Sequence, residues 1–117
     1  RGKPKVRGNI ETVECQVRRL DDILRELGIA QVDLIKTDCE GAEADVFSTL
    51  PDEILNQCQW IVGELHDHTA FELLARLAPH FDLDLRKQMN RPRFRFHACN
   101  LNKVKELSRA DIEALQR

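Results

Sequence analysis

Two apolar segments, residues 32–37 and 59–65, most constrain what this chain can fold into. Each has the length of a strand, and neither alternates apolar with polar residues as a half-solvated strand does. Such runs are typical of strands that are covered on both faces of a parallel sheet. Residues 43–50, between them, are predicted to form a helix. The pattern therefore indicates an α/β protein with a parallel pair of strands.

The residues around this unit predict one further strand and two further helices. Residues 12–17 (TVECQV) alternate apolar and polar side chains, which indicates a strand with one solvated face. Apolar residues recur at helical spacing over 20–27, and Gly28 stands where a helix C-terminus favours a left-handed residue. Pro51 is expected in the first turn of a short helix, where its missing N–H costs nothing.

A third longer helix is predicted after the second apolar strand. Thr69 and Glu72 have the spacing of a capping box, which places the start of the helix there. Its apolar stripe is expected to consist of Phe71, Leu74 and Ala78.

The C-terminal segments complete the predicted fold. Residues 81–87 and 93–98 are strands whose connection is too short for a parallel crossover, so they are predicted to form an antiparallel hairpin. Ser108 and Asp111 form a second capping box before a last helix. We therefore predict an α/β fold with parallel central strands and an antiparallel C-terminal hairpin, with residues 1–117 as a single unit.

Charge and composition exclude several classes of protein. The net charge of −2, from 18 basic and 20 acidic residues, gives no overall field that would attract nucleic acid or an anionic membrane. No apolar run approaches the roughly 20 residues of a membrane-spanning helix, and residues 1–9 contain no apolar secretory segment. The four cysteines lack CxxC spacing, so reduced thiols in a cytoplasmic protein are expected, with a zinc site or disulfides as the alternatives.

Polar side chains follow both apolar strands at the point where each strand ends. Asp38 and Glu40 follow the first strand, and Glu64 and His66 lie at the end of the second. Ligands of open α/β sheets bind at the carboxyl ends of the strands, so these four side chains are predicted to converge on one rim. The alternative is structural, because an acid before a helix is often a cap worth about 1 kcal/mol.

The segment VDLIKTDCEGAEADVF (32–47) resembles the motif of the FkbM-type methyltransferases. In that motif a hydrophobic strand is followed by Lys, a variable residue, Asp, a variable residue and Glu-Gly-Ala-Glu. Two flanking segments, RRLDDIL (18–24) and IVGELH (61–66), resemble the family's neighbouring blocks. The matching residues of the central motif are Asp33, Lys36, Asp38, Glu40, Gly41, Ala42 and Glu43.

The resemblance implies a Rossmann-like fold that uses S-adenosylmethionine to methylate a hydroxyl group of a small molecule or sugar. Asp38 and His66 are then the candidate catalytic residues, as the base or as the group that orients the acceptor. Glu40 and Glu64 are expected to hold the acceptor or, with Asp38, a divalent cation such as Mg²⁺. Lys36 is expected to pair with an acid in the substrate site rather than to react.

One feature of that family is not found in the sequence. Folds that bind S-adenosylmethionine place a glycine-rich turn after their first strand, whereas the five glycines here include no GxG. The resemblance thus implies the C-terminal half of a methyltransferase domain, with cofactor-binding residues upstream of residue 1 and little activity on its own. The sheet edge left open in such a half is expected to favour a homodimer.

Two alternative functions remain. Residues 86–97 (RKQMNRPRFRFH) combine basic residues with Phe94 and Phe96, so this hairpin could bind RNA phosphates and stack on a base. The same alternation suits an ordinary strand with Phe inward and Arg outward, and nucleic acid is therefore not the expected partner. The second alternative is a non-catalytic interaction module.

Overall fold

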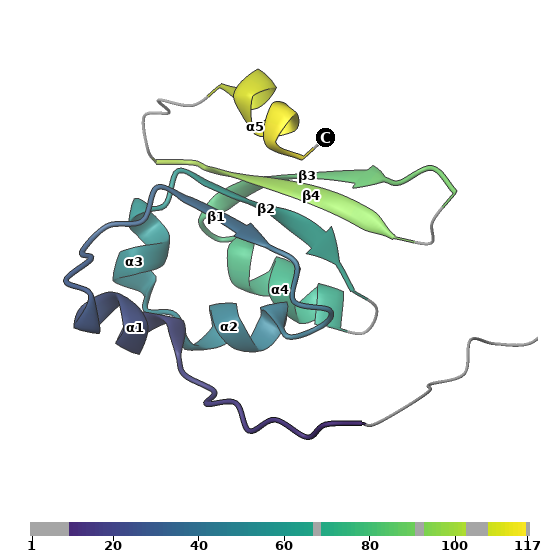
Figure 1. The fold of residues 1–117 in the computed structure, drawn as a ribbon. Coiled ribbons are helices and arrows are strands. Elements are labelled where there is room, and N and C mark those ends of the chain that lie inside the picture. The colour runs from purple at the N-terminus through teal and green to yellow at the C-terminus, as the bar shows by residue number, and fades with distance from the viewer. Residues whose placement is uncertain (1–9, 67–68, 91–92, 103–107, 117) are drawn as a thin grey trace, which may run out of the picture.

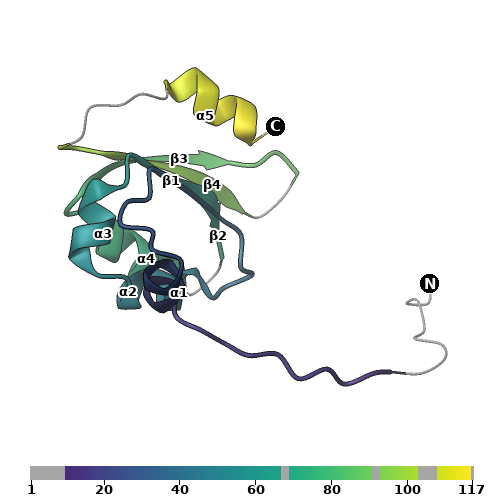
Figure 2. The same ribbon diagram turned by 60° about the vertical axis from the view of Figure 1, so that its left-hand side comes forward.

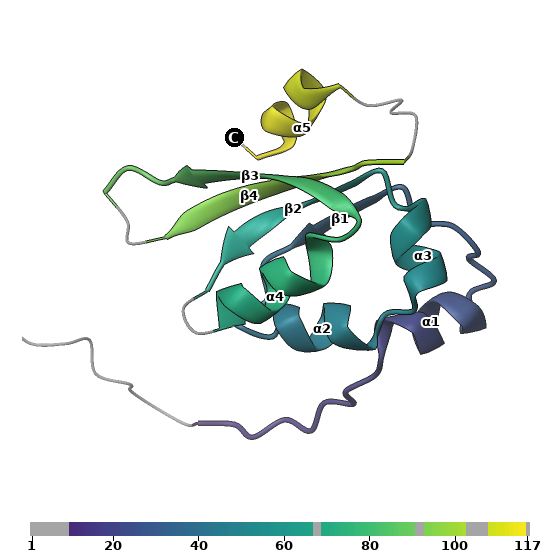
Figure 3. The same cartoon turned by 180° about the vertical axis from the view of Figure 1, so that it is seen from behind.

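The structure, a computed structural model, describes residues 10–66, 69–90, 93–102 and 108–116. Its elements are α1 (Leu20–Glu26), β1 (Leu34–Thr37), α2 (Glu43–Thr49), α3 (Asp52–Gln57), β2 (Trp60–Leu65), α4 (Ala70–Leu77), β3 (Phe81–Lys87), β4 (Phe94–Asn100) and α5 (Arg109–Leu115). The strands form one mixed sheet in the order β1-β2-β4-β3. Helices α1 to α4 cover one face of this sheet and α5 lies on the other (Figure 1, Figure 3).

The sheet has the predicted mixture of parallel and antiparallel pairs. β1 and β2 are parallel, whereas β4 pairs antiparallel with both β2 and β3. Thr37 lies opposite Gly63, so the residues that follow both positions reach the same edge of the sheet. β1 pairs only with β2 among the described strands, which is why Leu34 and Ile35 are half-buried rather than fully covered.

Gly63 permits the close approach of the two parallel strands. A Cβ atom at this position would lie 2.2 Å from the backbone oxygen of Thr37 and 2.7 Å from its Cγ2. Any larger residue would therefore force β1 away from β2, and with it the loop that carries Asp38.

The core has two parts, one on each face of the sheet. The larger part lies beneath the helical layer and includes Phe47, Leu55 and Phe96, all with no exposed surface. The smaller part holds α5 on the opposite face, where Ile112 packs against Trp60 and Val62 of β2. The predicted capping box of Ser108 and Asp111 is present at the start of α5.

The strand predicted over residues 12–17 is wrong. Residues 10–19 run away from the sheet without regular structure, and Val13 and Val17 are 72% and 95% exposed (Figure 2). Alternation produces an apolar face, but a strand also needs a partner to receive its hydrogen bonds. Residues 1–9, for which we expected no secretory segment, lie outside the described residues.

Two details of α4 also differ from the prediction. Thr69 precedes the helix but makes no capping bond, because its hydroxyl donates to the His66 carbonyl at 2.7 Å. Phe71 is 85% exposed and Ala78 is also exposed, whereas Leu73 and Leu77 are buried. The buried stripe therefore lies on a different face of the helix, and of the predicted residues only Leu74 borders it.

Two further predictions concern short helices and membranes. Pro51 is the residue before α3 rather than part of its first turn. Its backbone is extended and lies in the short connection between α2 and α3. None of the described helices is both long enough and apolar enough to cross a membrane.

Candidate active site

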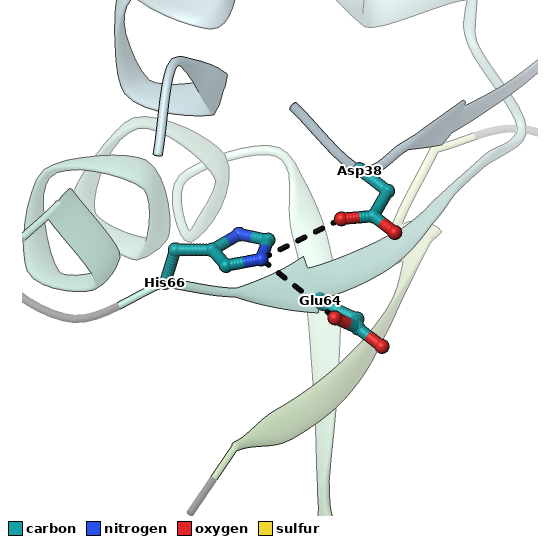
Figure 4. Close-up of side chains that lie close together, drawn as sticks. All are labelled: Asp38, Glu64 and His66. Atoms are coloured by element: carbon teal, nitrogen blue, oxygen red, sulfur yellow. Dashed lines mark ion pairs between the residues drawn. The ribbon is translucent and has the colours of Figure 1, made fainter. Parts of the chain in front are cut away.

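The four predicted site residues converge at the carboxyl ends of β1 and β2. Asp38 and Glu40 lie in the loop from β1 to α2, Glu64 lies in β2, and His66 directly follows it. The His66 Nε2 atom is 3.5 Å from Asp38 Oδ1, 3.7 Å from Glu64 Oε2 and 3.7 Å from Glu40 Oε2. Figure 4 shows Asp38 and Glu64 pointing toward this nitrogen from neighbouring strands. The predicted convergence on one rim is therefore present.

A tight backbone turn places the first two acids. Glu40 has φ 53° and Gly41 has φ 109°, so two consecutive residues adopt the left-handed region. Glycine suits this conformation at position 41, because it has no Cβ to clash there. For Glu40 the same region costs on the order of 1 kcal/mol, and such residues cluster at functional sites.

Glu43, in the first turn of α2, holds His66 from behind. Its side chain is only 1% exposed and accepts hydrogen bonds from the backbone amides of Cys39 and Gly41. Its Oε1 lies 3.1 Å from His66 Nδ1. Burial by itself raises the pKa of Glu43, but the amide hydrogen bonds and the nearby imidazole outweigh it, so this pKa lies below its ordinary value.

This contact sets the protonation of the His66 ring. An ionised carboxylate can only accept, so Nδ1 is the protonated nitrogen in its contact with Glu43. In the neutral ring Nε2 is then the unprotonated nitrogen, and it faces the acids of the rim. The sequence identifies Glu43 only as a matching residue of the FkbM-type motif. Its position as the last acid of the Glu-Gly-Ala-Glu motif was the signal of a larger role.

Arg93 supplies positive charge that the sequence did not assign to this site. Its Nη1 lies 3.5 Å from His66 Nε2, 3.6 Å from Glu64 Oε2 and 3.7 Å from Glu40 Oε2. The sequence places this arginine in the segment 86–97, whose alternative function is RNA binding. In the structure it faces the acids of the rim, which it partly neutralises.

Lys36 does not form the expected pair with an acid among the described residues. Side chains alternate along β1, and Lys36 lies on the α5 face together with Leu34, away from Glu43 and His66. Its Nζ donates to the Leu115 carbonyl at 3.3 Å. The expected acidic partner is thus not found among the described residues, and Lys36 instead hydrogen-bonds the end of α5.

The site also has the donor atoms of a metal centre. One ligand atom each from Asp38, Glu64 and His66 lie within 4.8 Å of one another. Carboxylate oxygens with one imidazole suit ions such as Mn²⁺ or Zn²⁺, and Glu43 occupies the place of the outer carboxylate that commonly orients a ligating histidine. The cation set expected from the sequence was Asp38, Glu40 and Glu64, so His66 takes the place of Glu40 in this cluster.

Comparison with known proteins identifies the family. A segment of 57 residues, 49% of this chain, is 44% identical to the AMB antimetabolite synthetase AmbE of Pseudomonas aeruginosa and covers 3% of that protein. A segment of 57 residues is likewise 37% identical to the 31-O-demethyl-FK506 methyltransferase FkbM of Streptomyces tacrolimicus and covers 22% of it. The matched segment thus spans less than a quarter of either relative, and no solved structure matches the chain. Residues 2–98 match the sequence profile of the methyltransferase FkbM domain, so the chain belongs to the methyltransferase FkbM family.

Proposed function

We propose that this chain forms the acceptor side of an active site that uses S-adenosylmethionine to methylate a hydroxyl group of a small molecule or sugar. One observation carries the proposal. Glu43 accepts a hydrogen bond from His66 Nδ1, while His66 Nε2 points toward Asp38 and Glu64. Family membership supports methyl transfer. The name of the Streptomyces relative, which acts on a 31-O-demethyl compound, supports oxygen as the acceptor atom.

The site residues have complementary roles in this proposal. A hydroxyl oxygen that gains a methyl group must lose its proton, and His66 Nε2 is the acceptor for that proton. The resulting imidazolium is stabilised by Asp38 at 3.5 Å and by Glu64 at 3.7 Å. Asp38 also accepts a hydrogen bond from the hydroxyl and orients its oxygen, and Glu40 holds neighbouring hydroxyls. Glu43 is a positioning residue, because its contact holds the proton on Nδ1 and leaves Nε2 as the nitrogen that can accept one.

The described residues include no glycine-rich turn of the kind that holds the methyl donor. Gly28 follows α1, Gly41 stands alone before α2, and Gly63 lies inside β2, so none belongs to a glycine-rich turn. The donor is expected to bind to residues outside the described ones. A Rossmann-like sheet would continue from the free edge of β1, and the same edge is our proposed contact in a homodimer.

A divalent cation at Asp38, Glu64 and His66 is a second route to the same reaction. A bound cation would coordinate the acceptor hydroxyl and lower its pKa. The cation, rather than the His66 imidazole, would then promote loss of the hydroxyl proton. The mutual distances within 4.8 Å favour this variant. Methyl transfer that requires added Mn²⁺ and stops with a chelator would distinguish it from the histidine route.

The alternative functions receive less support. RNA binding by residues 86–97 would use two aromatic rings, but Phe96 has no exposed surface and only Phe94 is accessible. Arg93 faces the acids, and Arg91 lies outside the described residues. A non-catalytic interaction module would not need the buried pair of Glu43 and His66, whose removal from water costs free energy. We also propose a cytoplasmic location, which fractionation of cells would test.

The experiment uses the full-length protein and two measurements. Calorimetric titration of S-adenosylhomocysteine tests donor binding, and transfer of a radiolabelled methyl group to a panel of hydroxyl compounds tests the reaction. His66→Ala is expected to lower the methylation rate about 100-fold or more without changing S-adenosylhomocysteine affinity, since general bases contribute that much. His80→Ala, outside the site, is the matched control.

Two outcomes would overturn the proposal. The first is that the full-length protein fails to bind S-adenosylhomocysteine at all. The second is that His66→Ala, Asp38→Asn and His80→Ala all methylate at the rate of the unchanged protein.

A further inference from the structure

A cavity lies on the α5 face of the sheet in the described part of the chain. It has a volume of about 640 Å³, which is within the range of small-molecule pockets. Its lining residues come from four elements, which Figure 1 labels: β2, the end of β3 with the following turn, β4 and the end of α5. The lining includes Arg86, Lys87, Met89, Arg95, His97 and Gln116.

This cavity leads to the acids of the candidate active site. A smaller cavity of about 130 Å³ is lined by Asp38 and Lys36, and it shares Glu64, Arg95 and Gln116 with the larger one. Glu64 is thus a wall of both cavities and a neighbour of His66 at 3.7 Å. A molecule in the large cavity would therefore lie next to Glu64, a residue of the candidate active site.

The acids in the cavity wall are already matched by other groups. Glu113 pairs with Arg86 at 3.2 Å. Glu64 accepts a hydrogen bond from the Gln88 amide at 2.8 Å and lies 3.6 Å from Arg93. Both acids of the wall therefore already have a partner within the protein.

Two cations of the wall have no such match. Lys87 and Arg95 are exposed and form no ion pair with the described residues. The negative end of α5 also borders the cavity, but Lys36 donates to its Leu115 carbonyl and offsets that partial charge. The three basic residues Arg86, Lys87 and Arg95 outnumber the two acids Glu64 and Glu113, so the cavity wall has a net positive charge.

His97 adds an unsatisfied polar group to the cavity wall. It is 5% exposed, and its Nε2 contacts the side chain of Gln116, another wall residue. Its buried Nδ1 has no hydrogen-bond partner among the described residues. Because Nε2 donates to Gln116 Oε1, Nδ1 of the neutral ring is a hydrogen-bond acceptor, and it would pair with a donor group of a ligand rather than with an anion.

We propose that this cavity binds an anionic group, a carboxylate or a phosphate, of the methyl acceptor. The inference rests on the proposed function and adds the substrate class: a hydroxyl compound that also bears an anionic group. Arg95 provides the planar, bidentate contact that suits both anions, and Lys87 provides a second charge. The hydroxyl then lies at Asp38 and His66.

The test measures anion binding separately from methyl transfer. Inorganic phosphate and citrate, as probes, are titrated into the full-length protein by calorimetry at low salt. The double variant Lys87→Gln/Arg95→Gln is expected to weaken the binding of both probes at least tenfold. Arg25→Gln, an exposed arginine of α1, is the matched control and should change nothing. His66→Ala should leave phosphate binding unchanged while it impairs methylation.

Several results would overturn the inference. Equal losses of phosphate and citrate affinity in the double variant and in Arg25→Gln would mean that the anions respond only to the net charge of the protein and not to this cavity. Normal methylation of neutral hydroxyl compounds, without binding of phosphate or citrate, would refute the anionic class but leave the proposed function standing. Single-stranded RNA that displaces phosphate and requires Lys87 and Arg95 would assign the cavity to nucleic acid instead. Loss of methylation in His66→Ala with intact phosphate binding supports both proposals.

Discussion

Replacing Glu43 with Gln is the sharpest test of how the site is held together. The carboxylate accepts from two backbone amides and contacts His66 Nδ1 while only 1% exposed. Hydrogen bonds to a charged group contribute roughly 1.5–3 kcal/mol each, and Gln retains one acceptor oxygen for one of the amides. Its NH₂ group must take the place of Oε1 or Oε2 and so face the backbone amide of Gly41 or of Cys39, and both contacts are unfavourable. We expect Glu43→Gln to lower the free energy of unfolding by about 2–4 kcal/mol.

Thermal and urea unfolding of the chain measure this loss. About 4 °C of Tm per kcal/mol applies to a domain of this size, so Tm should fall by about 8–16 °C. Glu40→Gln is the matched control, because the Glu40 side chain is 69% exposed and is not packed behind the imidazole. Its effect should stay within about 0.5 kcal/mol. Equal losses in the two variants would refute the structural role of Glu43.

The pH dependence provides an independent check on the same carboxylate. The pKa of Glu43 in the folded chain lies below its ordinary value of 4.5, so the ionised form contributes stability above that value. This contribution is lost as the pH falls through the folded pKa, where the carboxylate becomes protonated. The stability difference between the unchanged chain and Glu43→Gln should therefore shrink below pH 4.5. A difference that stays constant down to pH 3 would contradict the assigned pKa shift.

Three further predictions concern other parts of the fold. Gly63→Ala should destabilise the chain by about 3 kcal/mol in urea unfolding, because the added Cβ would lie 2.2 Å from the Thr37 backbone oxygen. An unchanged urea midpoint would show that β1 can move away from β2 without loss of stability. Cys58 should resist iodoacetamide at pH 8 while Cys15 and Cys39 react, because burial raises the pKa of the Cys58 thiol to about 12. Peptide mapping by mass spectrometry measures the modification of each cysteine, and rapid modification of Cys58 would contradict the prediction. Ser108→Ala should cost about 1 kcal/mol by removing the α5 cap, whereas Ala110→Ser, an exposed position of the same helix, should cost less; unfolding by circular dichroism compares them.

The rim of the site could be predicted because it depends on two local patterns and one general rule. Apolar runs fixed the places of β1 and β2, and polar residues at their ends gave Asp38, Glu64 and His66 as candidates. Parallel strands then bring their carboxyl ends to one edge. No knowledge of distant contacts was needed for this step.

Other features depend on what an element packs against, which a local pattern does not contain. Residues 12–17 alternate like a strand, yet no described strand pairs with them. In α4 the positions of Leu73 and Leu77 against the core decide which side is buried, so Phe71 faces solvent despite its apolar ring. Lys36 was expected to meet an acid, but strand alternation directs it to the end of α5.

Glu43 shows why the electrostatics of the site were beyond sequence reasoning. Its carboxylate is separated from His66 by 23 positions, and the left-handed turn at Glu40 and Gly41 brings two amides onto it. Those amides offset the cost of burying its charge, so the carboxylate stays ionised and fixes the proton on Nδ1. The same turn sets Glu40 within 3.7 Å of Nε2. One strained turn therefore determines both which nitrogen of His66 can accept a proton and which acids surround it, so changes to the turn should alter the reaction even where they contact no acceptor.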